Sequence, residues 1–333
     1  MNSAKPNTTR RASPADSLGS TDSPRSFIFA HLSDPHLSSL AGIRKRDLLN
    51  KRVLGYLSWR SRRRAEHLGS VLAALVHDLD CMHPEHIVVT GDLTHIGLPS
   101  EFREVNKWLQ NLGSPSRVTI IPGNHDAYVQ APWQETFAHW VPYMVSDKGH
   151  NSVATRSENT ALFPSLRVRG SVAFIGLSTA LPAPPFFATG SLGQSQLRRL
   201  QTILLETGRQ GLIRIILVHH PPLPGSEKWR KRLTDSAELC SILTREGVEM
   251  VLHGHSHRSE LAQLQTSAGL APVIGVPSAS AIGHRPGRRA QYNLYRLSND
   301  GTGWNLRISV RGLAPHGDCF IAVAEREINL RPA

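Results

Sequence analysis

The segment at 117–126 constrains the fold more than any other stretch of this chain. Residues 117–121 (RVTII) are rich in β-branched side chains and predict a short strand. A Pro-Gly pair ends the strand, and three adjacent polar residues follow, namely Asn124, His125 and Asp126. Side chains at such a strand end can point out of the core and form a site, although an ordinary polar turn has the same pattern.

Two other predicted strands in the first half also end in polar residues. The apolar run 27–32 is followed by Asp34-Pro35-His36, and the run 86–90 is followed by Gly91-Asp92. The carboxylate and imidazole of Asp34 and His36, two residues apart, can lie on one side of a strand end. That arrangement suits a metal ligand pair.

The second half repeats this arrangement with histidines. The predicted strand 214–218 runs into His219 and His220, and the predicted strand 248–252 runs into HGHSH at 253–257. Histidines two residues apart on a glycine-led turn, here His255 and His257, can each bind one of two neighbouring metal ions.

Amphipathic helices alternate with these strands. Leucines at helical spacing predict a helix from residue 65 to 79, and similar patterns predict helices at 99–112 and 194–206. Strands that alternate with helices indicate an α/β fold, in which ligands bind at the carboxyl ends of the strands. Further strands are predicted at 166–169, 172–179, 272–276, 292–297 and 306–310, and the turn at 298–301 predicts that the last two form an antiparallel pair.

Composition restricts the partners. The chain has 333 residues and a formal net charge of +12, which favours anionic partners such as nucleic acid, anionic lipid or phosphorylated substrates. Three widely spaced cysteines indicate neither a disulfide framework nor a thiolate metal site, so a reducing cytoplasmic setting is expected. Residues 1–26 are rich in Ser, Thr and Pro, lack a signal-peptide pattern and are expected to be a disordered tail.

A basic segment at 44–64 interrupts the first half. It contains nine Lys or Arg residues interleaved with apolar residues at roughly helical spacing, including Tyr56 and Trp59. One hypothesis is an interfacial helix that contacts an anionic membrane. The alternative is a helix that packs on the domain and exposes a solvated basic face.

These motifs together resemble the calcineurin-like metallophosphoesterases. The matching residues stand in the family's order from Phe27 to about Leu313 and comprise Asp34-x-His36, Gly91-Asp92, Gly123-Asn124-His125-Asp126, His219 and Gly254-His255-x-His257. The resemblance implies a four-layer α/β/β/α sandwich with two mixed sheets, formed by one domain over 27–333 into which the basic segment is inserted.

The resemblance also implies a binuclear metal centre. One ion would be bound by Asp34, His36 and His257 and the other by Asn124, His219 and His255, with Asp92 bridging them. Manganese, iron and zinc suit these ligands, and a hydroxide shared by the two ions would attack phosphorus in line. His125 would stabilise the transition state or protonate the leaving oxygen, and Asp126 would orient the His125 ring. His220 would lie behind the ligands or face the substrate.

Three functions follow from the resemblance. The motif pattern is closest to bacterial members that resemble class III cyclic nucleotide phosphodiesterases, so we expect a phosphodiesterase. A first alternative is a UDP-diacylglucosamine-type pyrophosphatase that acts on a lipid-linked substrate at the inner face of the membrane, although those enzymes typically have Arg in place of His125. A second is a non-catalytic basic protein that associates with membrane or nucleic acid; the phosphodiesterase itself needs no nucleic-acid partner.

Overall fold

The computed structural model describes residues 26–37, 40, 43–148, 162–284, 287–301 and 303–332. The predicted tail therefore lies outside the described residues, except for Ser26. None of the helices in these ranges is both long enough and apolar enough to cross a lipid bilayer.

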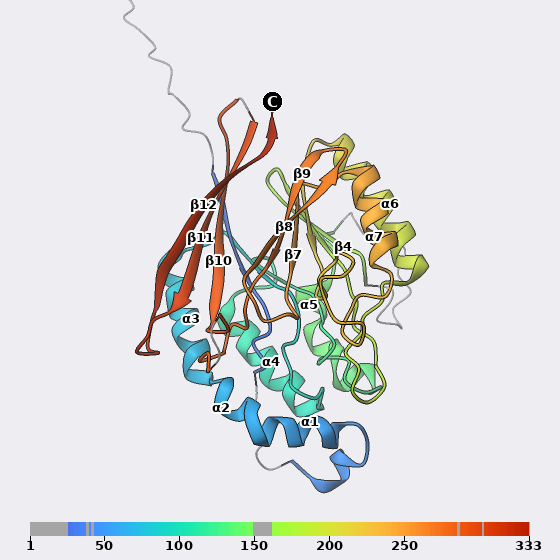
Figure 1. The fold of residues 1–333 in the computed structure, drawn as a ribbon, viewed down its shortest axis with the longest axis vertical. Helices are drawn as coiled ribbons and strands as arrows, with labels where there is room; N and C mark the ends of the chain where they lie inside the picture. Colours follow the sequence, from blue (N-terminus) through green and yellow to red (C-terminus); the bar gives the residue numbers. More distant parts are fainter. Residues whose placement is uncertain are drawn as a thin grey trace, which may run out of the picture.

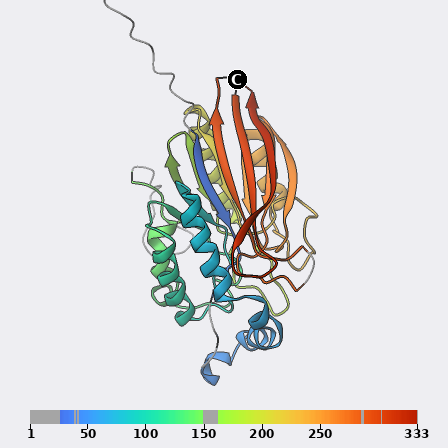
Figure 2. The ribbon, with the colours of Figure 1, turned by 90° about the vertical axis from the view of Figure 1, so that its left-hand side faces the viewer.

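The first sheet has six strands in the order β12-β11-β10-β1-β2-β3. The strands β1 (Phe27–Leu32), β2 (His86–Val89) and β3 (Val118–Ile120) are parallel to one another. The antiparallel strands β10 (Gln291–Asn299), β11 (Gly303–Leu313) and β12 (Phe320–Pro332) extend this sheet from β1. Figure 2 shows these long strands side by side.

The second sheet also has six strands, in the order β4-β5-β6-β7-β9-β8. The strands β5 (Val172–Gly176), β6 (Ile213–Leu217), β7 (Met250–His253) and β9 (Gly269–Gly275) are parallel. The edge strands β4 (Ser165–Arg169) and β8 (Glu260–Thr266) are antiparallel to their neighbours. Both sheets are thus mixed, as the resemblance implied.

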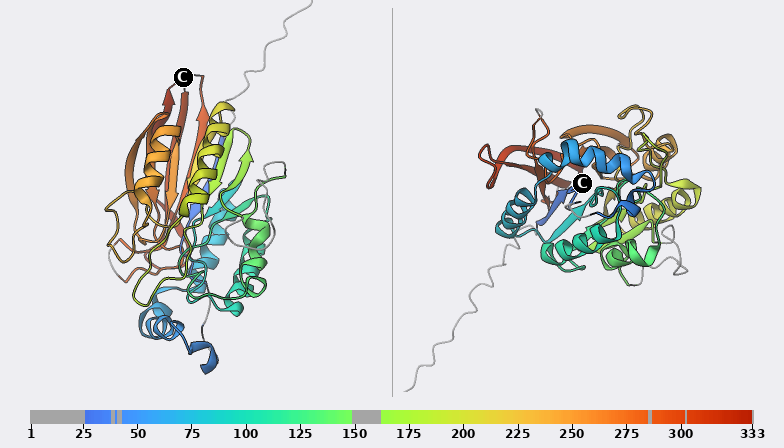
Figure 3. Two further views of the ribbon diagram at one scale, coloured as in Figure 1. Left: turned by 90° about the vertical axis from the view of Figure 1, so that its right-hand side faces the viewer. Right: turned by 90° about the horizontal axis from the view of Figure 1, so that it is seen from below.

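Helices cover the outer faces of both sheets. The first sheet carries α3 (Gly69–Met82) and α4 (Pro99–Leu112), and the second carries α6 (Gly193–Arg209) and α7 (Ser236–Glu246) (Figures 1 and 3). Side chains alternate along each strand, so that Phe174 packs on Phe29 of the first sheet while Ala173 and Ile175 pack beneath the helices. The predicted four-layer sandwich is confirmed.

The middle of the chain forms short helical turns. Residues 133–140 form two 3-10 turns, η3 (Trp133–Glu135) and η4 (Phe137–Trp140), and the short helix α5 (Val141–Met144) follows. Trp140 is fully buried against Phe102 of α4 and fixes these turns on the domain.

The basic segment is helical. It contains the 3-10 turn η1 (Lys45–Leu48), the helix α1 (Arg52–Ser58), the π-helical turn η2 (Trp59–Arg63) and the helix α2 (Arg64–Glu66). Figure 1 shows α1 and α2 at one end of the molecule, and the view from below shows α1 crossing in front of the strands (Figure 3).

The contacts of α1 show that its inner face is packed. Trp59 is buried in a small cluster with Leu40, Ile96 and Leu98. A Cβ atom on Gly55 would lie 2.4 Å from Cγ2 of Ile96, so only glycine allows α1 to approach this closely.

The stability of the sandwich should depend on pH through His86. Its ring stacks on Phe174 with centroids 4.8 Å apart, its Nε2 lies 2.8 Å from Oγ1 of Thr119, and burial lowers its pKa from 6.5 to about 3. The unfolded chain therefore binds one more proton than the folded protein between these values, and His86 opposes folding increasingly as pH falls below 6.5.

We expect His86→Gln to reduce this acid sensitivity. The free energy of unfolding of the variant should fall less steeply between pH 6.5 and 4, by up to about 1.4 kcal/mol per pH unit. Urea titrations across that range measure the difference, and His77→Gln, at an exposed position of α3, is the matched control. Equal slopes for wild type and His86→Gln would contradict the prediction.

Candidate metal centre

The loops after β1, β2, β3, β6 and β7 meet at one edge of the two sheets. Backbone hydrogen bonds fix their relative positions: Asp34 N donates to Gly91 O at 3.0 Å, and Gly254 N donates to His219 O at 3.1 Å. Gly91 has a φ of +96°, and a Cβ there would lie 2.7 Å from Nδ1 of His219. The loops can approach this closely only because Gly91 has no side chain.

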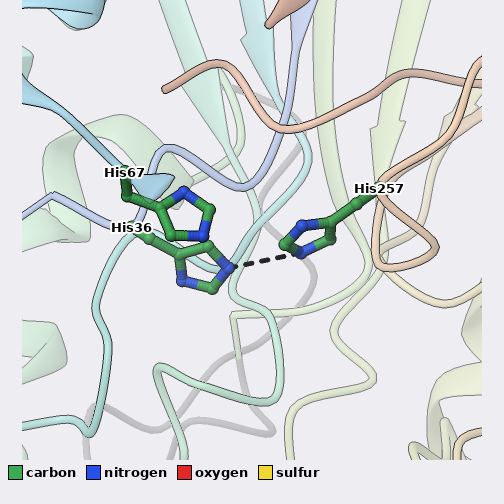
Figure 4. Close-up of side chains that lie close together, drawn as sticks. All are labelled: His36, His67 and His257. Atoms are coloured by element: carbon green, nitrogen blue, oxygen red, sulfur yellow. Dashed lines mark hydrogen bonds between the residues drawn. The ribbon is translucent and has the colours of Figure 1, made fainter. Parts of the chain in front are cut away.

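One cluster gathers around Asp34. Its Oδ1 lies 3.0 Å from Nε2 of His257 and 3.9 Å from Nε2 of His36, and the two histidine nitrogens are 3.3 Å apart. His67 stands beside them, and Figure 4 shows the three imidazole rings together. His36, His67 and His257 offer ligand atoms that all lie within 4.8 Å of one another.

A second cluster gathers around His219. Its Nε2 lies 3.2 Å from Oδ1 of Asn124 and 3.3 Å from Oδ2 of Asp92. His255 completes a group with Asp92 and His219, while Asp92 also groups with Asp34 and His36. Asp92 therefore belongs to both clusters, at the place where a bridging ligand would stand.

The electrostatics of the site favour cations. Burial alone would raise the pKa of Asp34 and Asp92, but the neighbouring charges of His257 and His219 outweigh burial and lower both. Burial would lower the pKa of His219, yet the charge of Asp92 raises it to about 9. Two buried carboxylates are thus held in the charged form beside buried imidazoles, where an isolated charge would be strongly unfavourable.

An atom without a hydrogen-bond partner supports the fit of metal ions. Nε2 of His255 is buried and has no hydrogen-bond partner among the described residues. It lies in the second cluster, and carboxylate oxygen and imidazole nitrogen are typical ligands of zinc, manganese and iron. The donor set therefore fits two ions.

Backbone carbonyls orient two of the imidazoles. Nδ1 of His36 lies 3.0 Å from Thr94 O, and Nδ1 of His219 lies 2.7 Å from Thr90 O. With Nδ1 donating to its carbonyl, the Nε2 of each ring is the atom directed at the cluster. Metal-binding histidines commonly show this second hydrogen bond.

The backbone is strained at the candidate ligands. Among the described residues, seven non-glycine residues have positive φ. Five of the seven are candidate ligands, with φ between 40° and 67°: Asp34, His36, Asp92, His255 and His257. Such a conformation is unfavourable by about 1–3 kcal/mol per residue and clusters at functional sites.

His125 lies at the edge of the first cluster, with its ring centroid 4.9 Å from that of His36. Its Nδ1 lies 2.5 Å from His95 O, and its two ring nitrogens lie 3.0–3.2 Å from Nη1 of Arg63. Burial, followed by the charge of Arg63, lowers its pKa to about 3. In this arrangement the ring is neutral, with its proton on Nδ1, and Nη1 of Arg63 lies beside both ring nitrogens.

Asp126 does not orient the His125 ring, contrary to the expectation from sequence. Its carboxylate accepts hydrogen bonds from Gly123 N at 2.9 Å and from Thr94 N at 2.8 Å, and it therefore fixes the loops after β2 and β3. The His95 carbonyl, which accepts the hydrogen bond from Nδ1 of His125, orients the ring instead. Every residue has a backbone carbonyl, so the sequence does not indicate which one contacts His125.

His220 does not face a substrate. It is fully buried, with Nδ1 2.7 Å from Oγ1 of Thr179 and Nε2 3.1 Å from Ala188 O. Its ring packs on that of His255 at 4.3 Å. His220 thus supports a candidate ligand from behind, which is the other place expected for it.

Two residues near the site were missed from sequence. Arg63 lies at the end of the basic segment and His67 three residues beyond that segment, and His67 N donates to Arg63 O at 2.9 Å. A helix places residues four apart on one face, and that spacing is the signal that links them.

The comparisons with known proteins agree with this geometry. Residues 27–259 match the model of the calcineurin-like phosphoesterase family. A probable cyclic nucleotide phosphodiesterase from Vesicomyosocius okutanii is 24% identical over 69% of this chain and 84% of its own length. A cAMP/cGMP dual specificity phosphodiesterase from Mycobacterium tuberculosis is 26% identical over 73% of this chain and 65% of its own length.

The fold has relatives among solved structures. A dimetal phosphatase from Danio rerio superposes with a TM-score of 0.55 at 15% identity, covering 91% of this chain and 99% of the other. At this identity the likeness concerns the fold alone. The family match covers more than half of the chain, and the chain is therefore a member of the calcineurin-like phosphoesterase family, a metal-dependent phosphoester hydrolase.

Proposed function

We propose that this protein hydrolyses phosphodiesters at a binuclear metal centre formed by the two clusters. The observation that carries the proposal is the position of Asp92, which groups with His219 and His255 on one side and with Asp34 and His36 on the other. A carboxylate shared in this way is what two neighbouring ions require.

For the division of the ligands between the two ions we adopt the assignment that the resemblance implies. Asp34, His36 and His257 would bind the first, and Asn124, His219 and His255 would bind the second. Manganese, iron and zinc all suit these nitrogen and oxygen donors, and no thiolate favours zinc alone. Bound ions would polarise the phosphoryl oxygens and lower the pKa of a shared water.

The chain itself orients the group nearest the leaving oxygen. The His95 carbonyl accepts a hydrogen bond from Nδ1 of His125 and orients the ring, and Nε2 of His125 would lie toward the leaving oxygen of a bound phosphodiester. Asp126 fixes the loop that carries His125 and Asn124, because its carboxylate binds the backbone of residues 94 and 123. His125 lies on the same side of the site as Arg63.

The substrate class is a diester. The curated relatives that match over most of this chain bear phosphodiesterase names, and they include a glycerophosphodiester phosphodiesterase from Enterobacter lignolyticus, which is 24% identical over 71% of this chain. Turnover of bis(4-nitrophenyl) phosphate, 4-nitrophenyl phosphate and cyclic AMP by purified protein with added manganese tests the class. Cleavage of the monoester alone would contradict the proposal.

Removing the shared carboxylate should abolish hydrolysis. We expect Asp92→Ala to lower kcat/KM for bis(4-nitrophenyl) phosphate by at least about 1,000-fold, because both ions lose a ligand and the shared water loses its activation. Elemental analysis of the purified variant should also find less metal per chain. Asp80→Ala, at an exposed position of α3, is the matched control. Full turnover by Asp92→Ala would exclude this site.

A specific observation favours a second candidate, hydrolysis of a lipid-linked pyrophosphate at a membrane surface. Leu49, Val53 and Leu57 are four residues apart along the basic segment and are 84%, 39% and 55% exposed. The 181–189 loop, whose Ala183 carbonyl accepts a hydrogen bond from Lys51, adds exposed Leu181 and Phe186. Arg44, Lys45, Arg46 and Arg60 are exposed on the same segment.

This pattern fits an anionic membrane. Exposed apolar side chains enter the headgroup region while neighbouring cations bind the lipid phosphates. The inner face of the segment is packed on the domain, which is the packing that the alternative interpretation from sequence expected. Such a contact would hold the active-site end of the molecule at the lipid surface.

Vesicle binding tests this second candidate. We expect the protein to co-sediment with vesicles containing phosphatidylglycerol, and the double variant Leu49→Ser, Leu57→Ser to bind at least about tenfold more weakly because it loses apolar contact area. The double variant Leu261→Ser, Leu270→Ser removes leucines that are 44% and 43% exposed outside this segment and is the control. Equal binding by all three proteins would contradict a docking role for the segment.

A further inference from the structure

The guanidinium of Arg63, from the basic segment, lies at the edge of the candidate metal site. Nη1 of Arg63 lies 3.0 Å from Nε2 of His125, and the side chain is half-buried. Burial lowers the pKa of Arg63, while the charges of Asp92 and Asp34 partly oppose that effect. The guanidinium is thus near enough to the candidate ligands to interact with their charges.

Arg63 has no carboxylate of its own. Among the described residues its side-chain hydrogen bonds are to His125, and it forms no ion pair. Two carboxylates interact with the charge of Arg63, those of Asp92 and Asp34. The metal ions would bind the same two carboxylates. With ions present, the guanidinium would face a site with excess positive charge, a position that is favourable only when an anion binds there.

The position of Arg63 is set by its helix. Four residues later on the same face, His67 packs its ring 4.8 Å from that of His36. Oγ of Ser280 lies 2.8 Å from Nδ1 of His67 and Oγ of Ser278 lies 3.2 Å from it. Because this end of the helix is anchored on the metal site, the direction of Arg63 is defined by packing rather than by a flexible loop.

Arg63 lies on the side of the leaving group. His125, which the resemblance places at the leaving oxygen, is its hydrogen-bond partner. A leaving alkoxide is strongly basic and needs a proton, whereas a leaving phosphate departs as a stable anion and needs a cation beside it instead. A guanidinium binds phosphate oxygens through two parallel N–H groups, which suits this role.

We propose that Arg63 binds a second phosphate group in the leaving portion of the substrate, so that the preferred substrate is a diester of pyrophosphate. This inference rests on the proposed function and narrows its substrate class. An oxygen from water bonds to the attacked phosphorus while the bridging P–O bond breaks. The bridging oxygen leaves with the electron pair on the second phosphate, and two phosphate monoesters result.

The structure has room for the remainder of such a substrate. A cavity of about 380 Å³ adjoins the first cluster and is lined by His36, His67, Trp59, Arg64 and Leu68, among others. Its volume falls within the range of small-molecule pockets, about 300–1,000 Å³. Gly69 lines it too, and a Cβ there would meet no atom within 4 Å, so this side of the cavity is open.

Binding of two non-hydrolysable anions tests the proposal without turnover. Titration calorimetry of the metal-loaded protein compares methylenediphosphonate, which has two phosphonate groups, with methylphosphonate, which has one. We expect Arg63→Met to weaken methylenediphosphonate binding by about 10- to 100-fold and methylphosphonate binding much less. The affinity of Arg63→Lys for methylenediphosphonate should lie between the affinities of the wild type and of Arg63→Met, because lysine keeps the charge and loses the parallel N–H groups.

Arg62→Met is the matched control, since it removes the same charge from an exposed neighbouring position. It should leave the ratio of the two affinities unchanged. Retained methylphosphonate binding shows that Arg63→Met is folded, and Arg63→Lys gives the same ratio test without the loss of charge. An unchanged ratio in both Arg63 variants, or an equal loss of both ligands, would overturn the proposal.

Turnover separates this inference from the proposed function. For Arg63→Met, kcat/KM should fall more for a nucleoside diphosphate ester such as UDP-glucose than for bis(4-nitrophenyl) phosphate. Failure of the wild-type protein to cleave any diester with added manganese would refute the proposed function itself. The role of Arg63 alone would be refuted by a different result. In that case the wild type cleaves bis(4-nitrophenyl) phosphate, and Arg63→Met lowers kcat/KM equally for both substrates.

Discussion

Two buried carboxylates set the conditions that the rest of the site must meet. Asp34 and Asp92 remain charged without solvent, between sheets that contribute mostly apolar side chains. Such charges persist only beside cations, and the protein provides imidazoles around them and room for metal ions. The left-handed backbone at these residues and the close approach at Gly91 both serve to bring the carboxylates to one point.

The sandwich supplies the rigidity that this arrangement requires. Parallel strands of both sheets end at the same edge, so each loop contributes one or two candidate ligands from a fixed strand end. The core between the sheets is formed by aromatic side chains such as Phe29 and Phe174, which fix the distance between the two sets of loops. Strain at the ligands is tolerated because the packed strands on either side fix the path of the chain.

The sequence predicted the parts of this structure that local patterns encode. The strands that precede the candidate ligands, the helices α3, α4 and α6 and the pair β10–β11 follow from apolar periodicity and turn residues. Strand β8 was missed because its side chains are only half-buried, and α7 and β12 were also missed. The partners of His125 could not be predicted, since a backbone carbonyl and an arginine 62 residues away carry no local signal.

The basic segment carries both the exposed leucines and Arg63, which lies beside the candidate metal site. The exposed leucines and Arg63 lie within consecutive helical turns, and Gly55 lets that segment pack directly on the loops after β2 and β3. If lipid binding changes the affinity of the site for its substrate, thermodynamic linkage requires that substrate change the affinity for lipid by the same factor. The residence time on a membrane would then depend on whether the active site is filled.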